Sequence, residues 1–215
     1  MKYIIIAVAS LCATLSLGAQ DYPEPEFTNE IYFLKKDTAK SLMRLEKESV
    51  KLESKTKGAG FGGYENGYNL DGEKSSARLN KGNNLSFVFS NGNSSAGRSS
   101  SPQQDSMMRA NGMDPSSMSG MMGGMSDPAN TIALYKADVA KGKRKILMQK
   151  IGGAFGGGKL QSSEKYTFSV RKVREGYWEL VIDKSLPKGE YAFTATSYMS
   201  GGMDGSATLF SFGVD

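Results

Sequence analysis

The chain has 215 residues, a formal net charge of +5 and 39% hydrophobic residues, with no histidine and a single cysteine, Cys12. Without an imidazole, the chain lacks the usual base of hydrolase triads, the common ligands of catalytic zinc and the usual proton shuttle at neutral pH. Any enzyme built on this sequence would depend on carboxylates, on serine–lysine pairs or on bound cations.

The N-terminus predicts an exported protein. Lys2 is followed by an apolar run over residues 3–17 and by Gly18-Ala19, before a polar stretch begins at Gln20. This order is typical of a secretory signal peptide, so we expect residues 1–19 to be removed and the mature protein to be periplasmic or extracellular. The apolar run is shorter than the roughly 20 residues that a membrane-spanning helix needs.

Cys12 lies inside this signal segment. A lipoprotein signal has an aliphatic residue three positions before the cysteine and a small residue just before it, whereas Ala9-Ser10-Leu11 has the reverse order. We therefore expect no lipid at Cys12. The mature chain then contains no thiol, no disulfide and no thiolate metal site.

Residues 20–90 carry the first predicted strands, over residues 31–34, 75–79 and 85–90, with a turn at Asp71-Gly72. Residues 37–57 are ambiguous, because their apolar positions suit either two short strands or one amphipathic helix. The hairpin-like turns on either side favour strands.

Residues 91–128 form a low-complexity insertion rich in Gly, Ser and Met, which we expect to be a disordered or loosely held loop. Within it, a Met-x-x-Met spacing occurs twice and resembles the methionine motifs of extracytoplasmic copper carriers; the residues are Met118, Met121, Met122 and Met125. Thioethers are soft, uncharged ligands that select Cu(I) or Ag(I). A flexible linker or adhesive loop is the competing interpretation, and the serine–glycine background favours it.

Residues 129–215 predict further hairpins. The segments 132–136 and 145–149 form one, with the basic tract 141–145 at its tip, and 166–171 and 177–182 form another around a turn at 174–176. A corner at 186–189 precedes a new strand, and residues 208–214 complete the sheet. The basic tract has an alternative role at an anionic lipid or polysaccharide surface, which would make the protein a peripheral membrane protein.

About nine to eleven short strands with Gly-rich turns predict an all-β fold, an antiparallel sandwich whose two sheets close over inward-facing aromatic residues. The segments GEKS at 72–75, IALYK at 132–136, LPKGEYAF at 186–193 and FGVD at 212–215 resemble uncharacterised secreted bacterial proteins of immunoglobulin-like β-sandwich type. The resemblance implies an immunoglobulin-like fold and carries almost nothing about activity.

Two glycine-rich segments, 58–64 and 153–159, share a Gly-aromatic-Gly character. The second has the spacing of a phosphate-binding loop, but Leu160 stands where the magnesium-binding Ser or Thr is required, so we interpret both as hairpin connections at one end of the sandwich. An exposed apolar tip for a protein or a sugar would then consist of Phe61, Tyr64, Phe155, Tyr198 and Met203. The competing interpretation, which we favour, is that these side chains cover the sheet ends.

The leading functional hypothesis is a non-catalytic periplasmic or surface-associated β-sandwich that serves as a structural or binding module of the cell envelope, with an envelope protein or a glycan as partner. Interspersed charges argue against a nucleic-acid partner. The alternatives are soft-metal binding by the methionine insertion and a carboxylate-dependent glycan-processing enzyme. For the enzyme no pair stands out among the acids near predicted turns, which are Glu65, Asp71, Glu73, Asp183 and Glu190.

Overall fold

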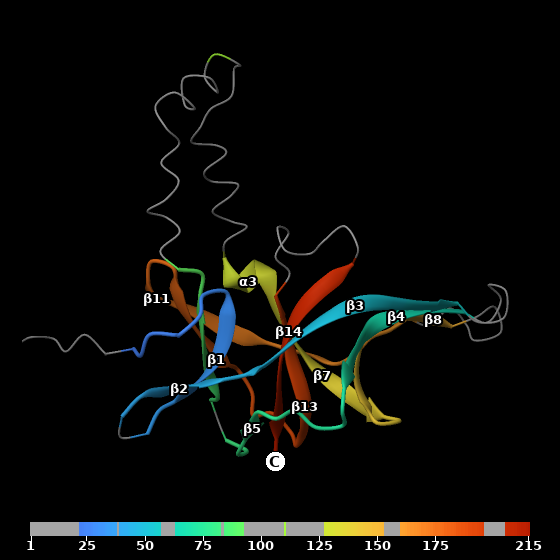
Figure 1. The fold of residues 1–215 in the computed structure, drawn as a ribbon, viewed down its shortest axis with the longest axis horizontal. Coiled ribbons are helices and arrows are strands. Elements are labelled where there is room, and N and C mark those ends of the chain that lie inside the picture. The colour runs from blue at the N-terminus through green and yellow to red at the C-terminus, as the bar shows by residue number, and fades with distance from the viewer. Residues whose placement is uncertain are drawn as a thin grey trace, which may run out of the picture.

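The computed structural model describes residues 22–37, 39–56, 63–82, 84–92, 110, 127–152, 160–195 and 205–215. Most of these residues lie in strands, which form two antiparallel sheets (Figure 1). A single helical turn, α3 (Pro128–Thr131), is capped by Asp127, whose carboxylate accepts a hydrogen bond from the Ala129 N–H at 2.9 Å. No helix in the described ranges is long and apolar enough to cross a membrane.

The smaller sheet has five strands in the order β11-β12-β6-β1-β2. Their bounds are Phe168–Arg174 for β11, Tyr177–Ile182 for β12, Ser86–Ser90 for β6, Glu30–Lys35 for β1 and Ser41–Arg44 for β2. The hairpin β11–β12 confirms the pairing predicted for the two alternating segments around residue 175.

The larger sheet has the order β10-β7-β13-β14-β3-β4-β8-β9, and the short strand β5 pairs in parallel with β14. The bounds are Lys165–Tyr166 (β10), Ile132–Ala140 (β7), Gly189–Ala195 (β13), Ser206–Val214 (β14), Glu46–Thr56 (β3), Gly63–Asp71 (β4), Lys143–Gly152 (β8), Leu160–Gln161 (β9) and Arg78–Leu79 (β5). Residues 41–56 therefore form two strands, as favoured, and not a helix.

The larger sheet closes on itself, because β8 also pairs with β7 through Asp138↔Lys145 and its neighbours. The strands β7, β13, β14, β3, β4 and β8 thus form a closed ring. Five buried side chains from five of them fill its interior: Leu70, Ala137, Ile146, Ala192 and Leu209. This closure goes beyond the predicted sandwich of two sheets.

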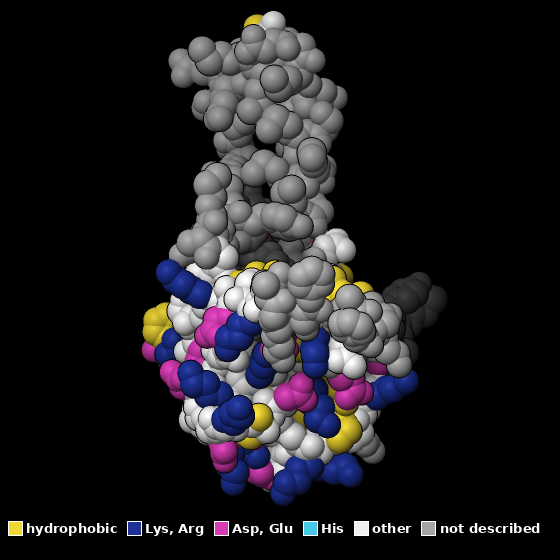
Figure 2. Space-filling view, turned by 90° about the vertical axis from the view of Figure 1, so that its right-hand side faces the viewer, with side chains coloured by type: hydrophobic (Ala, Val, Ile, Leu, Met, Phe, Trp, Pro, Cys, Tyr) yellow, Lys and Arg dark blue, Asp and Glu magenta, His cyan; other side chains and the backbone are white. Residues whose placement is uncertain are grey.

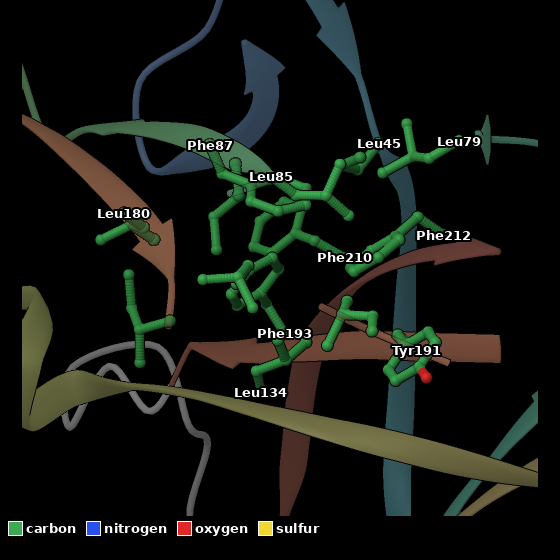
Figure 3. Close-up of a cluster of buried hydrophobic side chains, with 14 of the residues drawn as sticks. Leu45, Leu79, Leu85, Phe87, Leu134, Leu180, Tyr191, Phe193, Phe210 and Phe212 are labelled. Carbon is green, nitrogen blue, oxygen red and sulfur yellow. The ribbon is translucent and has the colours of Figure 1, made fainter. Parts of the chain in front are cut away.

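The main core lies between the outer face of this ring and the smaller sheet (Figure 3). The ring centroid of Phe87 on β6 lies 4.9 Å from the ring centroid of Phe193 on β13 and 5.1 Å from that of Phe212 on β14. Aromatic side chains bury a large apolar area, so these contacts hold the two sheets together. The prediction that the sheets close over aromatic residues is confirmed.

Two sequence predictions differ from the structure. The predicted strand 75–79 is shorter in the structure: Arg78 and Leu79 pair with β14, and the Ala77 carbonyl accepts a hydrogen bond from the Gly213 N–H at 2.8 Å. The Ser75 N–H donates instead to the Glu190 carboxylate at 2.8 Å. The strand β4 was not predicted at all, although it pairs along its whole length with β8.

The basic tract 141–145 lies at the tip of the β7–β8 hairpin, as predicted, but it is not one basic patch. Arg144 is 1% exposed and points into the ring, where its guanidinium donates to Glu48 at 3.0 Å and to the carbonyl of Asp71 at 2.7 Å. Its neighbour Lys143 is exposed and lies 3.6 Å from an Asp71 carboxylate oxygen. Alternate residues of a strand point to opposite faces, so the tract is divided between interior and surface.

Candidate functional site

Beyond the ring, β3, β4, β8 and β9 continue as a projecting sheet, on the right in Figure 1. We call this part the arm and define it as residues 52–56, 63–67, 148–152 and 160–161. Its strands are joined by continuous pairing, including Thr56↔Tyr64, Tyr64↔Ile151 and Ile151↔Leu160. Residues that pair directly in an antiparallel ladder point to the same side, so the register defines the two faces of the arm.

One face of the arm carries exposed apolar side chains, with the polar residues Ser54, Asn66 and Gln149 in one row between them. Leu52 is 37% exposed, Ile151 38% and Leu160 65%, and they account for three of the five exposed large hydrophobic residues in the described ranges. The register places them on the face that also carries Tyr64 and Tyr68. Clustered apolar exposure of this kind marks an interaction surface more often than scattered residues do.

This face continues into the open end of the ring. Four partly buried side chains pack against the interior cluster, namely Val50, Tyr68, Tyr135 and Met148. Burial raises the pKa of Tyr68, and the nearby Tyr135 adds to the effect, so its hydroxyl remains protonated. We call the apolar residues of this face together the apolar strip: Val50, Leu52, Tyr64, Tyr68, Tyr135, Met148, Ile151 and Leu160.

Polar groups between the apolar residues of the strip form hydrogen bonds to one another. The hydroxyl of Tyr64 lies 3.2 Å from Ser54 Oγ and accepts a hydrogen bond from Asn66 Nδ2 at 3.1 Å. Asn66 Oδ1 is buried and has no hydrogen-bond partner in the part of the chain that the structure describes. A buried acceptor without a partner is costly, and this atom is too enclosed for a docked partner to reach, so the directional contact of the face is the Tyr64 hydroxyl.

The opposite face of the arm is charged and self-neutralised. A shallow hollow is lined by Glu53, Lys55, Glu65, Gly67, Asn69 and Lys145, in which Lys145 pairs with Glu65 and Lys55 lies 3.6 Å from Glu53. Figure 2, which looks at the molecule from the tip of the arm, shows Lys and Arg interspersed with Asp and Glu on this side of the molecule. Paired surface charges bind neither nucleic acid nor anionic surfaces strongly, so the apolar face is the better candidate site.

Of the five residues predicted to form an apolar tip, the structure describes Tyr64, which belongs to the strip. Phe61, Phe155, Tyr198 and Met203 lie outside the described residues, so their part in the tip stays a prediction. The flanks of their segments do come together: Gly63 pairs with Gly152, and the N–H of Leu52 donates to the carbonyl of Gly205 at 3.0 Å. The prediction that the two glycine-rich segments share one end is confirmed for these flanks.

Sequence reasoning missed Leu52, Ile151 and Leu160 as members of a site. The signal was present in residues 64–70, where Tyr64, Tyr68 and Leu70 alternate with polar or small residues. If that segment had been recognised as a strand that pairs with residues 143–152, both glycine-rich loops would have been placed at the same end of the sheet. The apolar residues next to both loops would then have fallen on one face.

A buried carboxylate forms a second cluster, on the outer face of the smaller sheet. Glu179 is 0% exposed; Tyr22 donates its hydroxyl to Oε2 at 2.8 Å, and Lys36 Nζ lies 2.8 Å from Oε1. Desolvation opposes its ionisation, but the donors Lys36, Arg171 and Tyr22 outweigh it and lower the pKa of Glu179 to about 2. A carboxylate held ionised by three donors is a poor general acid, so this cluster is structural or recognises a partner.

The remaining acids and the methionines define no further site in the described ranges. Glu190 is buried and pairs with Arg78, Glu65 lies within β4, and no three His, Cys, Asp or Glu residues of the described chain gather around a point. The four proposed metal ligands, Met118, Met121, Met122 and Met125, lie outside the described residues. Soft-metal binding therefore stays a prediction.

Comparisons with known proteins do not assign this chain to a family. No family model matches the chain, and neither the curated proteins nor the solved structures include a significant match to it.

Proposed function

We propose that this protein is a non-catalytic periplasmic or surface-associated binding module of the cell envelope, which holds an envelope protein or a glycan on the apolar strip. The observation that carries the proposal is the exposed apolar row of the arm, where Ile151 and Leu160 lie side by side with Tyr64 and where Leu52 is exposed on the same face. An apolar sheet face in water is unfavourable until another surface covers it.

The strip has the composition of a recognition surface. Tyrosine and methionine are enriched at protein interfaces, and tyrosine rings also stack on sugars while their hydroxyls form hydrogen bonds. The hydroxyl of Tyr64 would fix the orientation of the partner, while the apolar residues supply most of the binding free energy.

The proposal includes export and an immunoglobulin-like fold. Its support for export is the signal-like segment 1–19, and its support for the fold is the face-to-face packing of two antiparallel sheets. The closure of the larger sheet by β7 and β8 is a feature that the resemblance does not imply. Residues 91–128 serve in this proposal as an insertion between β6 and β7.

Paired variants of the mature chain, residues 20–215, test the function. The variant Ile151→Ser with Leu160→Ser makes the strip polar, whereas Val139→Ser changes a residue of β7 that is 47% exposed and lies outside the strip. We expect envelope fractions crosslinked to the wild-type chain and to the control to yield the same partner, and the strip variant to bind it about tenfold more weakly.

Two results would contradict the proposal: equal recovery by the strip variant and the control, or repeated recovery of the isolated monomer alone. Competition by purified envelope polysaccharide separates the two partner classes, because a glycan partner is displaced by soluble sugar and a protein partner is not.

A further inference from the structure

The segment before β1 crosses the outer face of the smaller sheet without joining it as a strand. We call residues 22–27 the strap. In the described chain, backbone hydrogen bonding of this region begins at Asn29, whose N–H donates to the carbonyl of Ser90 at 2.6 Å. The strap itself is held by side chains and by single backbone groups that bond to side chains.

The strap covers an apolar cluster that would otherwise face water. Leu34, Val88 and Tyr177 are at most 2% exposed on this outer face, and Tyr22 packs against them. The ring of Tyr22 meets that of Tyr177 edge to face at 6.0 Å. Removing the strap without a replacement would expose this cluster together with the buried carboxylate of Glu179.

Three successive strap residues have dedicated partners. Tyr22 donates to Glu179 and lies under the ammonium of Lys40, 4.4 Å from its ring centre. The carbonyl of Pro23 accepts a hydrogen bond from Tyr177 Oη at 2.6 Å, and Glu24 pairs with Arg174. The face thus recognises a tyrosine, a proline carbonyl and an acid in that order.

Charge complementarity extends along the strap. Its acids are Glu24 and Glu26, and the face beneath it presents Lys36, Lys40, Arg44, Arg171 and Arg174. At its far end, the Phe27 N–H donates to Tyr32 Oη at 3.1 Å, and the Arg44 guanidinium lies 4.6 Å from the Phe27 ring centre.

The connection to β1 is short. Only Thr28 and Asn29 separate the strap from Glu30, and Asn29 has a φ of 59°, a left-handed conformation that costs energy in a residue other than glycine. A short, strained hinge next to an element held by side chains favours exchange of that element between identical chains.

We propose that the face around Glu179 and Tyr177 is a peptide-recognition site for the N-terminal segment of a second copy of this chain, and that its own strap fills it here. The inference requires removal of residues 1–19, which leaves Gln20 as a free end two residues before Tyr22. It does not depend on the apolar strip. Reciprocal exchange joins two copies, and one-way exchange joins copies into chains.

The concentration of the protein determines whether the site holds its own strap or the strap of a second copy. A segment tethered next to its own site has an effective concentration on the order of millimolar, so the strap stays in place in dilute solution. Exchange between copies becomes more favourable where the local concentration of the protein is high, as on a surface.

Two variants of the mature chain test the strap and the face separately. The strap variant, Tyr22→Ala with Glu24→Ala, keeps the site and loses its occupant. The face variant, Tyr177→Phe with Arg174→Ala, keeps the strap and loses two of its partners. Lys172→Ala is the matched control on β11, because Lys172 pairs with Glu175 and does not contact the strap.

A labelled synthetic peptide of residues 20–28 is titrated into each chain by fluorescence anisotropy. We expect saturable binding to the strap variant and at least about tenfold weaker binding when the face changes are added, because hydrogen bonds to charged groups are lost. The Lys172→Ala change should leave the affinity unaltered. In light scattering, an equimolar mixture of strap and face variants should form a heterodimer that neither forms alone.

The proposal is overturned if the folded strap variant binds no peptide up to about 1 mM, the range of the tethered concentration, and the mixture stays monomeric. Circular dichroism checks the fold of each variant. If the strap variant does not fold alone, it is refolded with the peptide at about 1 mM; recovery of the native circular dichroism spectrum supports the proposal, and failure to recover it overturns the proposal.

Discussion

Each of the buried charged side chains Arg144 and Glu30 is held by several partners. Arg144 donates to Glu48, to Glu46 at 3.3 Å and to the carbonyls of Asp71 and Gly72. Glu30, 3% exposed, accepts from Arg44 and from Lys47. Since an unpaired buried charge costs several kcal/mol, roughly 3–5 on loss of one partner, these side chains fix the register of the strands that carry them.

The pH dependence of folding should report the ionised state of Glu179. Its pKa is lowered to about 2 in the folded protein, against an ordinary value of 4.5. A depressed carboxyl pKa stabilises the folded state above the unfolded-state pKa, and this stabilisation is lost as the pH falls from about 4.5 through about 2, on the order of 2 to 3 kcal/mol. Urea unfolding of the wild type and of Glu179→Gln between pH 2 and 7 measures it.

We expect the variant to be less stable at neutral pH and to lose less stability on acidification than the wild type. Glu175→Gln removes the same charge from an exposed side chain on the same hairpin and controls for net charge. Parallel pH profiles for the wild type and Glu179→Gln would contradict the ionised, triply hydrogen-bonded carboxylate.

Among the elements, two hairpin tips differ in what surrounds them. Gly176 ends the β11–β12 turn with a φ of 70°, and a Cβ built there would lie 2.2 Å from the carbonyl oxygen of Gly92. Gly142 ends the β7–β8 turn with a φ of 76°, and nothing lies within 4 Å of its added Cβ. The two turns have the same backbone requirement, but only at Gly176 would an added Cβ meet another segment.

Alanine at the two tips should therefore have unequal effects. Gly142→Ala meets only the unfavourable φ and should lower the free energy of unfolding by about 1 kcal/mol. Gly176→Ala also forces the hairpin away from Gly92 and should cost on the order of 3 kcal/mol or more. Chemical denaturation of both variants measures the difference. Equal effects would show that the contact with Gly92 does not constrain the hairpin.

The local sequence predicted the strands in which strongly apolar residues alternate with polar ones. It failed where residues that are rare in strands weaken this alternation. Trp178, Leu180 and Ile182 marked β12 because β-branched and aromatic residues dominate its inward face. In β4, Gly67 and Asn69 occupy the alternate positions, and both residue types are depleted in strands. Gly67 is nevertheless required, since an added Cβ would lie 2.4 Å from the Ile146 carbonyl oxygen.

At the scale of the whole molecule, sequence indicated an all-β architecture but not its pairings. Closure of the ring joins β3 and β4, from the first half of the chain, to β14 and β8, from the second. Register between distant strands depends on which faces are buried together, and this is decided only when the whole core assembles. The apolar strip follows from that closure, which explains why only Tyr64 of its residues was predicted.

The residues on either side of the methionine insertion both contact the β11–β12 hairpin. Before it, the Asn91 N–H donates to the carbonyl of Gly176 at 3.1 Å; after it, α3 contacts β11. Both flanks thus lie at the β11–β12 hairpin, so the body should fold without the residues between them. This makes the insertion a separable unit in which the proposed soft-metal ligands can be tested.

Under the alternative in which Met118, Met121, Met122 and Met125 bind Cu(I), deletion of residues 106–126 should abolish that binding while leaving the melting temperature unchanged. Thioethers are soft, uncharged ligands, so the site should compete with a Cu(I) chelator and show no affinity for Zn²⁺. Replacing the four residues by leucine keeps their volume, removes the sulfur and should reproduce the deletion. The measurement is a spectrophotometric Cu(I) titration against the chelator. Equal competition by the wild type and the leucine variant, or none by the wild type, would assign the insertion to linking or adhesion, because then its sulfur atoms contribute nothing to metal affinity.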